Sequence, residues 1–142
     1  MPDPESAGSR QGRPKAPRQP QRLLQWKSRQ AEEAVANRLR RQGYEILARN
    51  WRHNAGELDI VAFKGETLVF VEVKARHASE PGAALAAIDR RKQARLRLLA
   101  EAFVTVTHLE DKQVRFDAAE VELDQAGFVR DIRYLEGAFD SP

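Results

Sequence analysis

Two runs of alternating apolar and charged residues, joined by a short segment around Gly65, lie in the middle of the chain. Their sequences are GELDIVAF, starting at Gly56, and LVFVEVKAR, starting at Leu68. Such alternation is typical of β-strands, whose successive side chains point to opposite faces, and glycine suits the first central position of a two-residue hairpin turn. We therefore expect an antiparallel hairpin with Gly65 and Glu66 in its turn.

The expected turn also fixes which residues face each other across the hairpin. Counting outward from it gives the pairs Lys64–Thr67, Phe63–Leu68, Val61–Phe70, Asp59–Glu72 and Glu57–Lys74. The four charged residues at the open end then share one face. Near the turn that face becomes apolar, so another element is expected to cover it. The opposite face is expected to be core, with the side chains of Leu58, Ile60, Ala62, Val69, Val71 and Val73.

The charged face of this hairpin is unbalanced. Asp59 and Glu72 are expected to be opposite each other, and such carboxylates lie about 5 Å apart at Cβ and repel. Glu57 adds a third carboxylate, and only Lys74 is basic. A hard divalent cation with oxygen ligands is the simplest neutraliser, so the pattern predicts Mg²⁺ or Mn²⁺ held by Asp59 and Glu72. The simpler alternative is a polar face that meets water, as in many antiparallel sheets.

Composition limits where such a site operates. The 142 residues suit one domain and include no cysteine, which excludes disulfides and thiolate metal sites and fits a reducing compartment. The chain has no secretory signal and no run of about 20 apolar residues. We expect a soluble, cytoplasmic protein without membrane association.

Positive charge is concentrated near the N-terminus. Residues 1–30 contain seven basic and two acidic residues, whereas the whole chain has a net charge of +3. Residues 1–20 are rich in Pro, Gly, Gln and Arg and are predicted to form a disordered basic leader, followed by a single domain over residues 21–142. The leader either binds nucleic-acid phosphates without sequence preference or only raises solubility.

Periodicity on both sides of the hairpin indicates an α/β protein. Two helices are expected, at about Gln21–Arg41 and, after an N-cap at Asp89, Arg90–Val104. Further strands are expected at Tyr44–Asn50, Val114–Val121 and Phe128–Tyr134. The element order is then α-β-β-β-α-β-β, with a sheet of about five strands.

Charged residues on both predicted helices add candidates for a site. Glu32 lies beside the apolar stripe of the first helix, either as a boundary residue with its carboxylate in water or directed at the hairpin. Lys92 is at the head of the buried stripe of the second helix. Arg91 and Arg95 lie on the remainder of that helix and form either a solvated face or a phosphate-contacting surface.

Phosphodiester hydrolysis matches the chemistry of the hairpin. It needs a metal ion to neutralise developing charge, an activated water and a cation near the reacting oxygens. Asp59 and Glu72 can hold the metal, and Lys74 can stabilise the phosphate or position the water. An acid on one strand followed by Glu-x-Lys on the next resembles the core of the PD-(D/E)XK nuclease superfamily, although Leu58 replaces the proline of that motif.

A longer set of residues resembles the YraN family of small bacterial proteins, from about Ala31 to the C-terminus. The set comprises Gly43-Tyr44, Ile46-Leu47, Arg49-Asn50-Trp51-Arg52, Gly56-Glu57-Leu58-Asp59, Val71-Glu72-Val73-Lys74-Ala75-Arg76, Lys92 and Arg115-Phe116-Asp117. The resemblance implies a restriction-endonuclease-like α/β core, a mixed sheet flanked by helices, similar to that of Holliday junction resolvases. It also implies a nuclease acting on DNA in preference to RNA and, by analogy with those resolvases, a homodimer.

The resemblance also implies roles for individual residues. It carries Asp59, Glu72 and Lys74 over as the catalytic set. Glu32 matches an acid on the family's first helix that approaches the metal in related nucleases, although Ala31 replaces the glycine usual before it.

Further residues are assigned around this set. Glu57 matches the family's Gly-Glu-x-Asp run and is expected to support the site as the partner of Lys74, and Lys92 is a second supporting residue. The arginines expected to bind nucleic acid are Arg76, Arg91 and Arg95.

Other readings stay open at this point. A protein with the same fold that binds nucleic acid without cutting it is the main alternative, and a structural or assembly factor without metal affinity is another. Arg115 and Asp117 are expected to form a buried ion pair rather than contact substrate, and Trp51 to pack under the strand connection rather than stack on a base. The three histidines are not spaced as zinc ligands.

Overall fold

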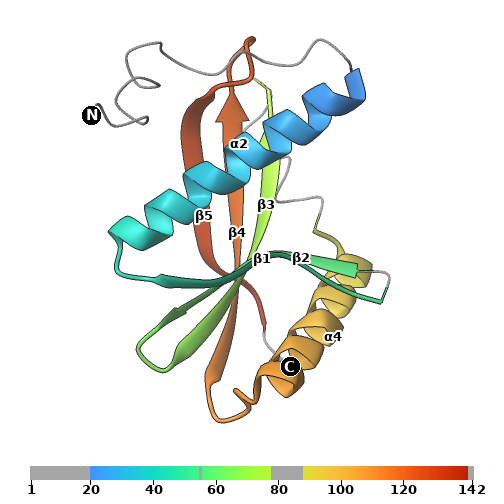
Figure 1. Ribbon diagram of the computed structural model, residues 1–142, viewed down its shortest axis with the longest axis vertical. Helices are drawn as coiled ribbons and strands as arrows, with labels where there is room; N and C mark the ends of the chain where they lie inside the picture. The colour runs from blue at the N-terminus through green and yellow to red at the C-terminus, as the bar shows by residue number, and fades with distance from the viewer. Residues whose placement is uncertain (1–19, 55, 78–87, 141–142) are drawn as a thin grey trace, which may run out of the picture.

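The computed structural model describes residues 20–54, 56–77 and 88–140, and within residues 20–28 only the backbone. The elements, labelled in Figure 1, are α2 (Pro20–Arg41), β1 (Glu45–His53), β2 (Gly56–Lys64), β3 (Thr67–Arg76), α4 (Arg90–Thr107), β4 (Gln113–Leu123) and β5 (Val129–Phe139). Their order confirms the predicted α-β-β-β-α-β-β arrangement. The predicted leader lies almost wholly outside the described residues, so its disorder stays a prediction.

The five strands form one mixed sheet in the order β1-β2-β3-β4-β5. All neighbouring pairs are antiparallel except β3 and β4, which are parallel. A parallel pair needs a long crossover connection, and the segment that contains α4 provides it. The structure therefore confirms the expected mixed α/β sheet of five strands. In the part of the chain that the structure describes, no helix is long and apolar enough to cross a membrane.

The two helices cover opposite faces of the sheet. Alternate residues of β3 divide between two cores, with Val69 and Val71 in the core under α2 and Leu68 and Phe70 in the core under α4. In Figure 1, α2 crosses in front of β3, β4 and β5, whereas α4 lies at the lower right against the other face. The apolar part of the charged face is covered, as predicted, and α4 is the element that covers it.

The helix ends follow from local hydrogen bonds. Asp89 is the N-cap of α4, as predicted, and its Oδ1 accepts a hydrogen bond from the Lys92 amide at 2.9 Å. The helix continues to Thr107, three residues beyond the predicted end at Val104. The prediction of an earlier end was wrong because His108, in the left-handed region at φ 59°, donates its amide to carbonyls of the last turn and caps it.

The hairpin register is confirmed near the turn and wrong at the open end. The pairs run from Lys64–Thr67 through Phe63–Leu68 and Val61–Phe70 to Ile60–Val71. Beyond Ile60, β2 pairs only with β1, so the expected cross-strand pairs of Asp59 with Glu72 and of Glu57 with Lys74 are replaced by others. The Asp59 carboxylate instead accepts a hydrogen bond from the Val73 amide at 2.8 Å.

The same divergence changes the face on which Leu58 lies. Leu58 is buried as predicted, but it packs in the core under α4, whereas Ile60 packs in the core under α2. The prediction placed every second residue of the strand on the same face, which assumes an untwisted strand, and real strands twist. The predicted single apolar face therefore breaks at Asp59, the residue at which β2 leaves β3.

The edge strands are longer than predicted. β1 includes Trp51, Arg52 and His53, which were expected to form a connection, and β5 continues to Phe139. Trp51 packs edge-on against Phe103 of α4, with ring centroids 5.3 Å apart. Trp51 packs against the protein interior, as predicted, but it does so from within β1 and not from under a strand connection.

Candidate active site

The candidate site lies where β2 separates from β3. Asp59 is the first residue of β2 beyond the paired segment, and its carboxylate reaches the Val73 amide, which lies between Glu72 and Lys74 on β3. This hydrogen bond ties the two strands together where their ladder ends. The divergence thus places the carboxylate of Asp59 beside the Glu-x-Lys segment.

Two lysines from different elements meet the carboxylate of Glu72. Lys92 of α4 lies 2.8 Å from Glu72 Oε1, and Lys74 lies 3.5 Å from the same oxygen. Glu72 is only 7% exposed, whereas both lysine side chains keep about a third of their surface in solvent. The Lys92 amide also donates a hydrogen bond to the Asp89 carboxylate, which caps α4, so Lys92 approaches Glu72 from the first turn of the helix.

The charge on Asp59 is destabilised in this position. Burial, repulsion by Glu72 and a weaker repulsion by Glu32 raise the pKa of Asp59 from 3.8 to about 7, against the Val73 hydrogen bond and the attraction of Lys74. Glu32 on α2 is itself only 6% exposed. It is therefore directed inward, and the alternative of a boundary carboxylate in water is wrong.

The pKa values of the two lysines are shifted in opposite directions. Burial and the neighbouring Lys92 lower the pKa of Lys74, against the attraction of Glu72. Burial also opposes the charge on Lys92, but hydrogen bonds with Glu72 and Lys74 outweigh it and raise the pKa of Lys92. Lys92 is thus the firmer cationic partner of Glu72, and Lys74 is the ammonium group that loses its proton more readily.

The acidic residues fit a cation with few protein ligands. Among the described residues, no group of three or more His, Asp or Glu is arranged to hold a metal ion. Mg²⁺ commonly uses one or two carboxylates and keeps several waters, and Asp59 and Glu72 supply such a pair. The raised pKa of Asp59 also fits, because burial and, after it, repulsion by Glu72 oppose the ionised carboxylate, and a divalent cation bound there would favour the ionised form.

Comparison with known proteins identifies the family. The model of the uncharacterised protein family UPF0102 matches residues 31–121. The chain belongs to the UPF0102 family. UPF0102 is the YraN family, so the resemblance seen in the sequence motifs is confirmed.

Relatives extend the match over most of the chain. A UPF0102 protein of Pseudomonas aeruginosa is 40% identical over 116 residues, which cover 81% of this chain and 93% of the relative. A UPF0102 protein of Parafrankia sp. is 42% identical over 118 residues, 83% of this chain and 99% of the relative. One from Dictyoglomus thermophilum is 37% identical over 108 residues, 76% of this chain and 92% of the relative.

Two residues assigned to the site in this UPF0102 chain lie elsewhere in the structure. Glu57 pairs with Arg52 of β1 at 3.3 Å and not with Lys74, because β2 has already left β3 at that point. Arg76 forms ion pairs with Glu120 and Glu122 of β4, and its side chain is only 12% exposed. We therefore remove Arg76 from the nucleic-acid-binding residues and Glu57 from those that support Lys74.

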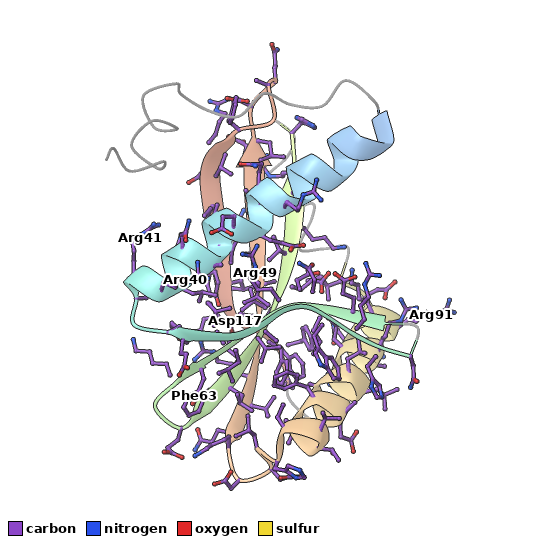
Figure 2. All side chains as sticks on the ribbon, viewed as in Figure 1. Arg40, Arg41, Arg49, Phe63, Arg91 and Asp117 are labelled. Atoms are coloured by element: carbon purple, nitrogen blue, oxygen red, sulfur yellow. The ribbon has the colours of Figure 1, made fainter. Side chains whose placement is uncertain are left out.

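The other assigned arginines are accessible. Arg91 and Arg95 are both exposed on α4, and Figure 2 shows Arg91 at the helix end that is farther from the β4 connection, pointing away from the sheet. Arg91 directly precedes Lys92 and Arg95 follows it by three residues, so both lie within about one helical turn of Lys92. They stay candidates for contact with phosphates.

Glu120 is a buried charged residue that sequence reasoning missed. It is 1% exposed, lies beside Lys74 in the parallel ladder and pairs with Arg76. Its position depends on the parallel pairing of β3 with β4, which the local pattern of β4 does not specify. The local signal in the sequence was a glutamate between the apolar residues Ala119 and Val121.

Proposed function

We propose that the protein is a metal-dependent nuclease that hydrolyses phosphodiester bonds in nucleic acid, acting as an endonuclease on branched or otherwise structured DNA with Mg²⁺ or Mn²⁺. The observation that supports it best is the arrangement at the point where β2 leaves β3. There Asp59, with a pKa near 7, lies beside Glu72 and Lys74, and Lys92 and Glu32 approach from the two helices. Family membership is consistent with this proposal but names no activity.

Each residue has a role that follows from its contacts. Asp59 and Glu72 would hold the metal ion, which when bound would neutralise negative charge that develops on the phosphate. Lys74 Nζ would donate a hydrogen bond to the attacking water or to a phosphate oxygen. Lys92 would keep the Glu72 carboxylate oriented through their 2.8 Å contact.

A nucleic-acid-binding module without cleavage is the second candidate. The observation that favours it is the pairing of Glu72 with both Lys74 and Lys92, which balances that carboxylate without a metal ion. Exposed Arg91 and Arg95 would then contact phosphates. The two candidates differ in whether bound nucleic acid is cut.

Cleavage assays on the wild type and Lys74→Ala test the proposal. Labelled duplex, single-stranded, flap and four-way-junction DNA are incubated with each protein in Mg²⁺ or Mn²⁺. We expect the wild type to cut at least one branched substrate and Lys74→Ala to cut it about 10²- to 10³-fold more slowly, as for loss of one electrostatic donor to a transition state. Lys112→Ala is the matched control, because Lys112 pairs with Glu66 at the hairpin turn, away from the site.

The outcomes separate the candidates. Equal cleavage by wild type and Lys74→Ala would point to a contaminating nuclease and contradict the proposal. Binding of the same substrates without cleavage would favour the module. Calorimetric titration with Mn²⁺ tests the remaining alternative of a structural factor, because we expect heat from the wild type that Asp59→Ala abolishes.

A further inference from the structure

A hollow of about 440 Å³ lies between α4 and the tip formed by β1 and β2. It is lined by His53, Asn54, Gly56, Arg95, Leu98, Leu99 and Ala102. The walls are thus mainly apolar, with an imidazole, an amide and a guanidinium among them. None of these residues belongs to the candidate active site, so the hollow is a separate feature of the fold.

One wall of the hollow is a preformed aromatic stack. The rings of His53 and Trp51 are nearly parallel, with an interplanar angle of 2° and centroids 5.3 Å apart. Trp51 is fixed in turn by its edge-on contact with Phe103. Trp51 covers one face of the partly buried imidazole, and His53 lines the hollow, so a planar group in the hollow could stack on the other face at little cost in entropy.

The outer wall of the hollow is an apolar part of α4 that the fold leaves uncovered. Leu98 is 67% exposed, although it lies beside the buried Leu99. Arg95 stands one turn before Leu98 and Leu99, at the same hollow. Leu98 and Leu99 offer an apolar surface on which a flat ring can pack, and Arg95 offers a cation that can contact a phosphate.

Two elements that line the hollow, α4 and β2, also carry residues of the candidate active site. On α4, Arg95 follows Lys92 by three residues, which places the two side chains on one side of the helix about one turn apart. On β2, Gly56 precedes Asp59 by three residues, or about 10 Å of strand. Gly56 packs so closely on α4 that a Cβ there would lie 2.7 Å from Leu99 Cδ1, so strand and helix meet directly at the hollow.

We propose that this hollow binds an unpaired nucleobase of the nucleic-acid substrate, near the phosphate that is cleaved. The base stacks on His53 against Leu98, Asn54 offers hydrogen bonds to the base edge, and Arg95 contacts the adjoining phosphate. The statement that the base lies near the cleaved phosphate rests on the proposed nuclease function. The binding of a base in the hollow does not depend on it. The substrate class is therefore single-stranded or branched nucleic acid, because bases within a duplex are stacked and paired and enter such a hollow only when flipped out.

Binding of a strand that contains 2-aminopurine tests this proposal without cleavage. The fluorescence of this base is quenched when it stacks, and EDTA keeps catalysis out of the measurement. We expect wild type to quench the single strand and to bind it at least about tenfold more tightly than the matching duplex. His53→Ala and Leu98→Glu should each weaken single-strand binding about 5- to 100-fold and remove the quenching, as for loss of one base stack. Leu98→Glu is included because Leu98 is exposed and its change is not expected to disturb folding.

His108→Asn is the matched control. His108 is an exposed histidine beyond the end of α4, and asparagine tolerates its left-handed backbone. We expect His108→Asn to bind and quench like the wild type. Equal wild-type affinity for single strand and duplex, or unchanged quenching in both hollow variants, would overturn the proposal even if the protein cuts DNA. If the quenching depends on His53 but the protein cleaves none of the DNA substrates, the nuclease proposal is contradicted and the base-binding site is supported.

Discussion

Asp59→Asn is expected to abolish phosphodiester cleavage, by at least about 10³-fold, and at the same time to make the protein more stable above pH 7. The activity falls because one of the two proposed metal-holding carboxylates is lost. The stability rises because a buried charge, which Glu72 and Glu32 also repel, is removed. An asparagine oxygen can still accept the Val73 hydrogen bond, so the local geometry is retained.

The sign of the stability change follows from the raised pKa. Below pH 4 the carboxyl of Asp59 is protonated in both the folded and the unfolded chain, so Asp59 and asparagine differ little. Between about pH 4 and pH 7 the unfolded chain ionises while folded Asp59 keeps its proton, so the wild type loses stability as the pH rises. Above pH 7 the difference is constant. We expect Asp59→Asn to be about 2–4 kcal/mol more stable there.

Thermal unfolding between pH 4 and pH 8, with and without Mn²⁺, measures both effects. Without metal, the Tm of Asp59→Asn should exceed that of wild type at pH 8 and match it at pH 4. With Mn²⁺, the wild type should gain stability through binding, and the variant should not. Asp131→Asn, which removes an exposed carboxylate on β5, is the control without either effect. A variant that is less stable at pH 8, or that still cuts at the wild-type rate, would contradict the assignment of Asp59.

The sequence predicted that Asp59, Glu72 and Lys74 lie close together, but not the geometry that joins them. Alternation and one glycine turn predicted the hairpin and its register through Val61 and Phe70, because these depend on local chain geometry. The separation of β2 from β3 at Asp59 could not be predicted by counting residues. It depends on strand twist and on the hydrogen bond that the Asp59 carboxylate accepts from the Val73 amide. That separation brings the Asp59 carboxylate to the Val73 amide, between Glu72 and Lys74, whereas a continuous ladder would place Asp59 directly opposite Glu72.

Charges were harder to place than apolar residues. Lys92 and Glu32 were recognised because helical spacing directs them towards the sheet, and both lie at the site. Arg76 was expected to bind nucleic acid, and the structure places it in ion pairs instead. Its partners Glu120 and Glu122 come from β4, which pairs in parallel with β3 only after α4 has crossed the sheet. Long-range pairing of this kind is not encoded in local periodicity.

The predicted ion pair of Arg115 and Asp117 is confirmed, and it is part of a larger network. Two nitrogens of Arg115 lie 2.9 and 3.0 Å from the two Asp117 carboxylate oxygens. The same carboxylate accepts hydrogen bonds from the Tyr134 hydroxyl at 2.5 Å and from the Gly137 amide at 2.9 Å. Burial and the nearby carboxylate of Asp117 raise the pKa of Tyr134. Asp117, which Figure 2 labels, is fully buried, so its charge depends on these donors.

Asp117→Ala is expected to destabilise the protein by about 3–5 kcal/mol, because it leaves the donors of a buried ion pair without their acceptor. Glu136→Ala is the matched control. Glu136 pairs with the same Arg115 at 3.0 Å but is 64% exposed, so its loss should cost at most about 1 kcal/mol. Urea unfolding of both variants at pH 7 measures the difference, and equal midpoints would show that the network does not hold β4 to β5.

The comparison with Asp59 gives this measurement a second use. Both aspartates lie beside β3, but Asp117 has four hydrogen bonds from Arg115, Tyr134 and Gly137, whereas Asp59 has two carboxylates as neighbours and a pKa near 7. Removing a carboxylate that the fold satisfies must lower stability, and removing one that the fold opposes must raise it. If Asp117→Ala lowers the unfolding midpoint while Asp59→Asn raises it, the carboxylate at Asp59 is maintained at a cost to folding. Such a cost is expected of a functional residue and not of a structural one.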